Sequence, residues 1–268
     1  KYSKELKELE REITLFHGEI IEKVTKNLDY QVDLIGFHGQ TIFHNADLKI
    51  SKQLGDGKLL SQITKRIVIN DFRKEDLLNG GQGAPLTPIF HKLICNHINK
   101  KFQLNLPLHI INIGGITNIT QIKDNINVQN SELVACDIAP GNCLIDEWIR
   151  KNSNDKFDNN GLIARSGKTD QLILNQAIDN FSLNFDYNKS LDVKDFDIFF
   201  AKGLSLQDGA STITEFSAKL IADGLSYTHG RDKASNYKWL VCGGGRKNKY
   251  LLDSIKNNFE HISIEPMS

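Results

Sequence analysis

Cysteine, methionine and tryptophan are all scarce in this chain: 268 residues contain four Cys, one Met and two Trp. The four cysteines form no Cys-x-x-Cys pair, which excludes the usual zinc-ribbon and dithiol motifs. Three of them lie in apolar stretches, where free thiols pack as small hydrophobic groups. We therefore expect structural thiols at Cys95, Cys136, Cys143 and Cys242.

The chain also lacks a net charge, because 33 Lys and Arg balance 33 Asp and Glu. This balance gives no reason to expect a nucleic-acid or anionic-membrane partner and favours a small-molecule substrate. No apolar run is long enough to span a bilayer, and no signal-peptide pattern opens the sequence. We expect a cytoplasmic protein, and since residue 1 is Lys1 and the single methionine is Met267, we expect residues before Lys1.

The pattern of apolar residues predicts an α/β protein with two domains. A long helix over residues 5–24 shows one apolar stripe, formed by Leu6, Leu9, Ile13, Phe16, Ile20 and Val24, and a self-associating coiled coil is the less favoured alternative. Strand, glycine turn and extended chain follow over 31–44, then a short helix (59–66), a buried strand (67–70), and a polar, glycine-rich loop. That loop leads to a helix opened by Pro85 and Pro88.

From residue 106 the pattern changes from helix-first to hairpin-first, so we place a domain boundary between 1–104 and 105–268. The second domain is predicted to contain a hairpin over 106–122 and a strand ending near Asp137. A helix follows, then a polar connector (189–196) and a helix over 208–225. A strand, a triple-glycine turn and a helix complete the domain.

The segment LVACDIAPGNCLIDEWI (133–149) sets one acid, Asp137, between an apolar run and a Pro-Gly turn. The pattern predicts Asp137 at the C-terminal tip of a strand, facing the start of a helix. In open α/β sheets ligands bind at such points. A turn or cap aspartate explains the residue about as well.

Two glycine clusters follow predicted strands. Gly114 and Gly115 lie in a turn between two strands, where exposed backbone N–H groups can meet an anion, although a plain hairpin turn explains the pair equally. Gly243, Gly244 and Gly245 lie between a strand and a helix, where a flat or phosphorylated ligand can approach the backbone. Neither cluster matches Gly-x-Gly-x-x-Gly, which argues against a nicotinamide-dependent dehydrogenase.

Two polar clusters complete the candidates. His38, Gln40 and Thr41 crowd hydrogen-bonding side chains at a strand end, and Arg73, Asp76 and Gln82 surround a glycine-rich stretch. An ordinary polar loop and a solvated charge run are the simpler explanations for each. His38 and His44 lack zinc-ligand spacing, so no metal ligand is predicted.

Five motifs in this order resemble the anhydro-N-acetylmuramic acid kinase family of the sugar kinase, Hsp70 and actin superfamily. They are FHGQT (37–41), DFRxxDxxxGGQGAPLxPxFH (71–91), NIGGITN (112–118), DIAPGNCLIDEW (137–148) and VCGGGRKN (241–248). The resemblance implies a two-domain actin-like, ribonuclease H-like fold with a cleft between the domains. It also implies a kinase that uses ATP and Mg²⁺ to open the 1,6-anhydro ring of the amino sugar with water and phosphorylate O6, in cell-wall (peptidoglycan) recycling.

The resemblance also implies residue roles. Asp137 matches the general base, and His38, Gln40, Thr41, Arg73, Asp76 and Gln82 fall on the sugar side. The nucleotide side is implied at Asn112, Gly114, Gly115, Asn118, Asp208, Gly243, Gly244 and Gly245. A homodimer is a further expectation.

The chain departs from the family pattern in three respects. It begins after the family's phosphate-gripping hairpin and stops before its closing helix, so we expect the first domain to be incomplete. Ile138 and Ala139 stand where relatives have a small polar residue and glycine. Two rival readings follow, a truncated remnant that does not catalyse the reaction and another sugar kinase or ATPase of the superfamily.

Overall fold

The computed structural model describes residues 4–102, 108–122, 133–182, 191–229, 238–258 and 263–266. Contacts divide the chain into two compact units, Lys1–Leu86 and Thr87–Ser268. The division lies before helix α4 (Thr87–Phe102), whereas the sequence placed it after residue 104. The reason is that His91 Nδ1 lies 2.8 Å from Thr120 Oγ1 and buried Cys95 packs with Leu108, so α4 belongs to the second unit.

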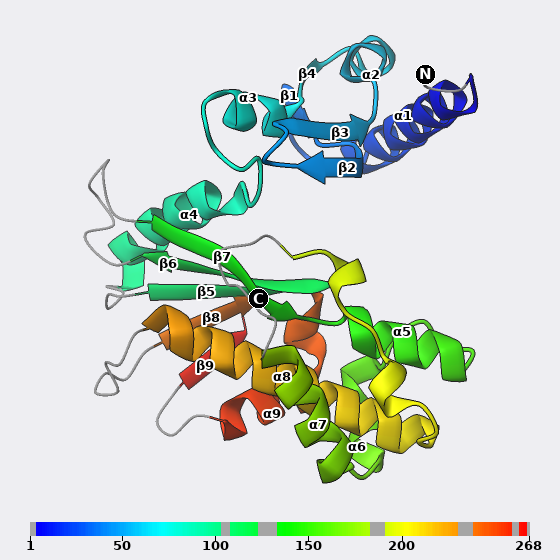
Figure 1. Cartoon of the computed structure of the whole chain (residues 1–268). Coiled ribbons are helices and arrows are strands. Elements are labelled where there is room, and N and C mark those ends of the chain that lie inside the picture. Colours follow the sequence, from blue (N-terminus) through cyan, green and yellow to red (C-terminus); the bar gives the residue numbers. More distant parts are fainter. Residues whose placement is uncertain are drawn as a thin grey trace. The chain divides into compact units, whose positions relative to one another are not determined.

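The first unit combines two small sheets with three helices (Figure 1). Strands β1 (Leu34–Phe37) and β4 (Ile67–Asn70) pair in parallel, and β2 (Gln40–Asn45) and β3 (Ile50–Leu54) form an antiparallel hairpin. The helices are α1 (Lys4–Thr25), α2 (Gly57–Thr64) and α3 (Phe72–Leu78). Ile35 and Phe37 of β1 and Leu60 of α2 form a buried core, and Ile21 of α1 packs against it.

Helix α1 is confirmed, but its predicted packing face is wrong. Phe16 and Val24 of the apolar stripe are 61% and 52% exposed, whereas Thr14 and Gly18 are buried. Thr14 Oγ1 accepts a hydrogen bond from Asp56 N at 3.0 Å, and a Cβ on Gly18 would lie 3.1 Å from Ile63. A short polar contact and a close helix approach therefore set the face that α1 buries.

Two further predictions for this unit are corrected. The strand over 67–70 exists, but Ile67 and Ile69 are 67% and 45% exposed, so it is not buried. The predicted polar loop after it contains helix α3, which starts behind Asp71 in the left-handed conformation (φ 63°). Pro85 precedes α4, and Pro88 lies in its first turn.

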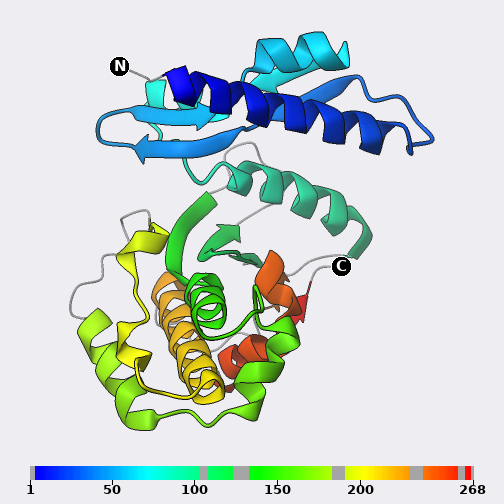
Figure 2. The same cartoon turned by 90° about the vertical axis from the view of Figure 1, so that its right-hand side faces the viewer.

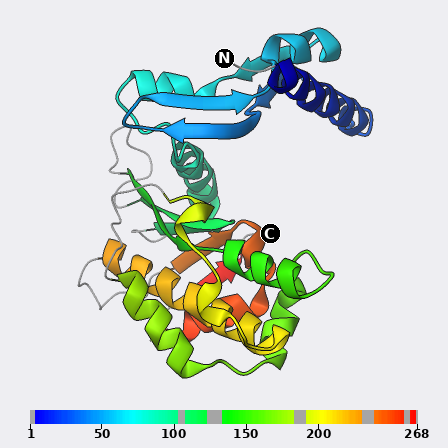
Figure 3. The same cartoon turned by 45° about the vertical axis from the view of Figure 1, so that its right-hand side comes forward.

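The second unit is built on a five-stranded sheet in the order β7-β6-β5-β8-β9. Helix α4 lies on one face of the sheet, and α5, α8 and α9 lie on the other (Figures 1, 2 and 3). The strands are β5 (Leu108–Ile113), β6 (Ile116–Ile122), β7 (Leu133–Pro140), β8 (Lys238–Cys242) and β9 (Ser263–Pro266). The helices after α4 are α5 (Cys143–Asn152), α6 (Leu162–Ser166), α7 (Gln171–Ser182), α8 (Leu206–His229) and α9 (Lys249–Asn257). Each predicted strand and helix of this unit is present, and α6, α7 and β9 were not foreseen.

Helix α8 is the centre of the main core. Its buried residues Ile213, Phe216 and Ile221 pack with the sheet residues Ile111 and Val241 and with the neighbouring helices. At its start Trp148 of α5 donates its indole N–H to Leu206 O at 2.9 Å. Among the described residues no helix has the length and apolar character needed to cross a bilayer.

Substituting Gly209 of α8 tests the α5–α8 contact. A Cβ at this position would overlap the Trp148 ring. Gly209→Ala should therefore lower the free energy of unfolding by about 1–3 kcal/mol, although Gly to Ala in an open helix normally stabilises. Urea denaturation measures the change, with the exposed neighbour Gln207→Ala as control. An unchanged or higher stability of Gly209→Ala contradicts this packing.

His91 makes the stability of this fold pH-dependent. Burial lowers the pKa of His91 below its ordinary value of 6.5, since the charged form loses solvation. Below that ordinary value the unfolded chain takes up a proton that the folded protein resists, so stability falls as the pH falls. His91→Gln should reduce the difference between unfolding free energies at pH 7.5 and about pH 5. The exposed His97→Gln of the same helix is the control, and equal acid losses in both variants would refute this assignment.

Candidate functional site

Three glycine-containing turns that are far apart in the sequence meet at one edge of the second unit's sheet. Strands β5, β7 and β8 run in the same direction, since β5 pairs parallel with β8 and β6 pairs antiparallel with both β5 and β7. Their carboxyl ends therefore lead into Gly114–Gly115, Pro140–Gly141 and Gly243–Gly245 at the same edge. Such an edge is where α/β sheets bind ligands.

Backbone hydrogen bonds join two of these turns directly. Gly141 N donates to Gly115 O, and Asn142 N donates to Gly114 O, both at 2.8 Å. Cys143 N donates to Gly115 O at 3.2 Å. The β5–β6 turn is thus attached to the beginning of α5. Gly141 cannot be replaced without movement, because a Cβ there would overlap Gly114 O.

A row of polar side chains crosses the sheet beside these turns. Asp137 pairs with Asn118, Asn118 with Asn112, and Asn112 with Cys242. Directly paired residues share a face of the sheet, so all four side chains lie on one side. We call Asp137, Asn118, Asn112 and Cys242 the polar row. All four are half-buried, and Cys242 Sγ lies 3.7 Å from Asn112 Oδ1.

The polar row lies on the face of the sheet that α4 covers. Thr120 points to the same face two residues along β6 from Asn118, and it contacts His91 of α4. The opposite face is filled by the apolar core under α5 and α8. The row is therefore on the edge of a packed layer and remains partly open to solvent.

Asp137 occupies a different place from the one predicted. It lies inside β7, which continues to Pro140, and the first residue of α5 is Cys143. The pairing shifts at this point, since Thr117 faces Ala139 and Asn118 faces Asp137, leaving Ile138 as a bulge residue. Ile138 is 1% exposed and packs in the core. Bulges of this kind redirect side chains.

The contacts of Asp137 do not fit the alternative of a helix cap. The N-cap position of α5 is held by Asn142, not by Asp137. Asp137 Oδ2 instead accepts a hydrogen bond from Leu191 N at 3.0 Å. Val193, two residues after Leu191, lies 3.9 Å from the Cβ position of Gly115. The half-buried carboxylate thus lies near the β5–β6 turn with one oxygen engaged by backbone.

The turns differ in how much room they leave for a ligand. Among the described residues, the nearest non-adjacent heavy atom to a Cβ on Gly115 or Gly244 would lie at 3.9 Å or 4.0 Å, respectively, and both glycines are exposed. Gly243 (φ 80°) and Gly245 instead press against the end of β5. Open glycine backbone beside a polar row suits a phosphate or a flat ring, so the residues present fit a nucleotide.

Asp208 and its helix start are engaged elsewhere. Asp208 Oδ1 accepts a hydrogen bond from Lys168 N at 2.7 Å, which is the main reason why the pKa of Asp208 is lowered. Ser211 Oγ lies 2.8 Å from Thr169 Oγ1, and Thr212 Oγ1 accepts from Asp170 N at 3.0 Å. These described contacts attach the start of α8 to the loop between α6 and α7. The polar residues at the start of this helix therefore have partners within the protein.

The first unit brings together a second set of predicted residues. Arg73 Nε donates to His38 Nε2 at 2.9 Å. Burial is the main cause that lowers the pKa of His44, and the nearby Arg73 charge adds to it, while a backbone hydrogen bond at Gln82 opposes it. The guanidinium, two imidazoles and the Gln82 backbone are therefore neighbours.

Asp76 organises the glycine-rich loop. Its Oδ2 accepts a hydrogen bond from Gly83 N at 2.6 Å, and a Cβ on Gly81 would overlap the same carboxylate, so the Asp76 side chain would have to move. Gln40 is exposed, with its amide on Thr41 O at 3.3 Å. Thr41 Oγ1 accepts from Gln53 Nε2, also at 3.3 Å. Gln40 and Thr41 thus belong to the hairpin contacts.

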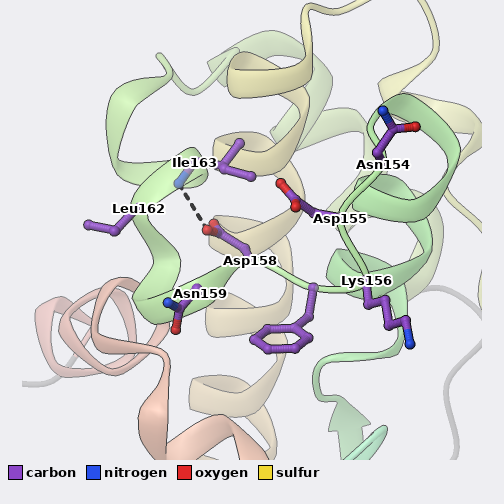
Figure 4. A pocket seen from close by; sticks show the side chains of 8 residues that line it. Asn154, Asp155, Lys156, Asp158, Asn159, Leu162 and Ile163 are labelled. Carbon is purple, nitrogen blue, oxygen red and sulfur yellow. Dashed lines mark hydrogen bonds between the residues drawn. The ribbon is translucent and has the colours of Figure 1, made fainter.

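A pocket of about 300 Å³ lies at the carboxyl ends of β1 and β4, lined by Phe37, His38, Ser51, Lys52, Gln53, Gly55, Asn70, Asp71 and Lys74. A larger pocket of about 470 Å³ lies at the loop between α5 and α6 (Figure 4). None of the predicted site residues lines it. Its buried Asp158 accepts hydrogen bonds from Ile163 N and Ala164 N at 2.9 Å, which anchor α6.

The thiols and the acids of the described segments show no metal-binding arrangement. Burial raises the pKa of Cys95, Cys136 and Cys143 to about 11, so these free thiols stay protonated at neutral pH. Within those segments no group of three or more His, Cys, Asp or Glu is placed to hold an ion.

Comparison with known protein families shows to which family the chain belongs. The model of the anhydro-N-acetylmuramic acid kinase family matches residues 3–268. The chain belongs to the anhydro-N-acetylmuramic acid kinase family.

Named relatives agree with this assignment. The anhydro-N-acetylmuramic acid kinase of Pelagibacter ubique is 49% identical over 255 residues, which cover 95% of this chain and 66% of that protein. The proteins of that name from Zymomonas mobilis and Rhodospirillum rubrum are 38% and 33% identical, over 91% and 98% of this chain and 65% and 66% of their own lengths. The chain thus spans about two thirds of the length of the curated relatives it matches.

A search of solved structures found a ROK family protein from Streptococcus pneumoniae in complex with sucrose. It is 12% identical, with a TM-score of 0.32, over 93% of this chain and 78% of the other.

Sequence reasoning missed three residues that the structure places among the kinase-family motifs. His44 was considered only as a metal ligand, Cys242 only as a packing thiol, and Asn142 was not singled out. His44 lies next to the predicted Arg73, and Cys242 ends the polar row. Asn142 directly follows the Pro-Gly turn, so its position in a quoted family motif was the available signal.

The contact between the β5–β6 turn and the Pro140–Gly141 turn predicts different outcomes for two Gly to Ala substitutions. Gly141→Ala should lower the unfolding midpoint by several degrees, on the scale of about 1–3 kcal/mol, because the methyl group would overlap Gly114 O. Gly244→Ala is the matched control, since its Cβ would lie at an ordinary van der Waals distance of 4.0 Å from Asn142 Nδ2 and should leave the midpoint nearly unchanged. Calorimetry of both variants makes the comparison, and equal midpoints would show that the turns are not in contact.

Proposed function

We propose that the full-length protein is an ATP-dependent kinase that opens the 1,6-anhydro ring of anhydro-N-acetylmuramic acid with water and phosphorylates O6. The product is N-acetylmuramic acid 6-phosphate, which feeds peptidoglycan recycling in the cytoplasm. The observation that carries this proposal is Asp137, which lies in the polar row beside three glycine turns at the carboxyl edge of the sheet. Family membership supports the substrate.

The proposed chemistry needs one base. The oxygen of a water molecule forms a bond to the anomeric carbon while the bond from that carbon to O6 breaks, and Asp137 takes the proton of the water. The released O6 then attacks the γ-phosphorus of ATP, and ADP leaves. Leu191 N holds one carboxylate oxygen at 3.0 Å, which fixes the orientation of the base.

The nucleotide side is proposed at the second unit. Gly115 and Gly244 offer open backbone, and Asn112 and Asn118 offer side-chain amides from the polar row. Mg²⁺ bound in kinase sites takes most of its ligands from phosphates and water, with one or two carboxylates, so the ion is proposed to be carried by ATP. Its chemistry is to neutralise charge on the transferred phosphoryl group.

The sugar side is proposed at the first unit. Arg73, His38 and Gln82 supply hydrogen bonds and a positive charge, which suit an amino sugar that carries a carboxylate. A nucleotide site on one unit and a sugar site on the other agree with the actin-like architecture that the family resemblance implies.

Asp137→Asn tests the base. The substitution keeps the size of the side chain but removes the proton acceptor, so turnover should fall by about 10²–10⁴-fold while ATP binding is retained. A coupled ADP-release assay with and without the anhydro sugar measures turnover, and calorimetric titration measures ATP binding. Asp155→Asn, an exposed acid of the same unit, is the control. Release of ADP at the parent rate by Asp137→Asn would refute the role.

The same assay separates the rival functions. ADP release only with the anhydro sugar supports the proposed kinase, whereas ADP release without any dependence on it indicates another ATPase. No ADP release from this chain, with or without the sugar, while a chain extended at both ends does release ADP with the sugar, indicates that this chain is a non-catalytic remnant.

A further inference from the structure

Asn142 stands at the point where the two joined turns meet the first turn of α5. It occupies the position before the helix, where an Asn side chain usually accepts a hydrogen bond from the helix backbone. Here it makes no such bond. Instead Nδ2 donates to Gly114 O at 2.9 Å and approaches Ile113 O at 3.4 Å.

The same side chain faces the third turn. A Cβ on Gly245 would lie 3.1 Å from Asn142 Nδ2, and one on Gly244 would lie 4.0 Å from it. Gly243 approaches the end of β5 as well, where a Cβ would lie 2.5 Å from Ile113 O. The amide of Asn142 therefore lies between the β5–β6 turn and the triple-glycine turn and contacts the first through a hydrogen bond.

Only a donor can perform this task. Gly114 O and Ile113 O are acceptors, so an Asp at position 142 cannot replace the Nδ2 contact. Asp is nevertheless as good as Asn in front of a helix. The Asn142→Asp exchange thus removes the contact with the turn while it keeps the preference of this position for a helix start.

We propose that Asn142 is a positioning residue. It holds the Gly114–Gly115 turn and the Gly243–Gly245 turn of the nucleotide side at a fixed distance from β7, the strand that carries Asp137. The inference rests on the proposed function for its kinetic consequence. It adds a residue to the site: Asn142 acts through the turns, and its loss shifts the backbone that ATP would contact.

The test compares Asn142→Asp and Asn142→Ala with the parent full-length protein. Both variants should raise the KM for ATP by about tenfold, the cost of one lost hydrogen bond to a partly buried carbonyl, and leave the KM for the anhydro sugar within about twofold. Asn248→Asp is the matched control. Asn248 also precedes a helix, but its Oδ1 accepts from Leu251 N at 3.0 Å, a role that Asp fills equally.

An unchanged KM for ATP in both variants overturns the proposal, and so does an equal rise in both Michaelis constants, which indicates general damage to the fold. A second readout does not depend on turnover. Amide hydrogen exchange at Gly141, Asn142 and Cys143 should speed up by about tenfold in Asn142→Ala, because their bonds to the β5–β6 turn weaken. If the parent protein releases no ADP, the proposed kinase function is refuted, but the positioning role of Asn142 is not. An unchanged amide exchange rate at residues 141–143 in Asn142→Ala would refute the positioning role even then.

Discussion

The hydrogen bonds between the Gly114–Gly115 turn and the start of α5 are the constraint on which the site depends. They fix the carboxyl ends of β5 and β7 relative to each other, since Gly141 N and Asn142 N both end on carbonyls of that turn. The β6–β7 pairing places Asp137 beside Asn118, and these bonds hold the following end of β7 at the β5–β6 turn. Without these bonds the motifs would be separate turns.

Small residues make this arrangement possible. Gly141 lies against Gly114 O, and Gly245 lies against Ile113, at separations that leave no room for a Cβ. The glycines that pack against neighbouring segments and the glycines that face solvent therefore have different roles. Gly243 and Gly245 allow packing, whereas Gly115 and Gly244 leave backbone open to a ligand.

The structure also gives the partners of the polar residues that sequence alone could only group. Asp137, Asp208 and Asp76 each accept a hydrogen bond from a backbone N–H group of a loop. The surroundings of the three carboxylates differ, because Asp137 lies in the polar row, Asp208 at the start of α8 and Asp76 beside the glycine-rich loop. These surroundings depend on contacts between segments that are far apart in the sequence.

The family could be expected from the resemblance of five motifs. The α/β class and most strands and helices could be predicted because apolar periodicity and glycine turns are local signals. The sequence by itself determined neither the buried face of α1, which Thr14 and Gly18 select, nor the boundary before α4, which the His91–Thr120 contact decides. It also placed Asp137 at a strand tip, since a bulge at Ile138 depends on how β6 and β7 pair. Pairing register, close helix contacts and the contacts of Asn142 arise between segments far apart in the sequence, so they could be known only from the folded chain.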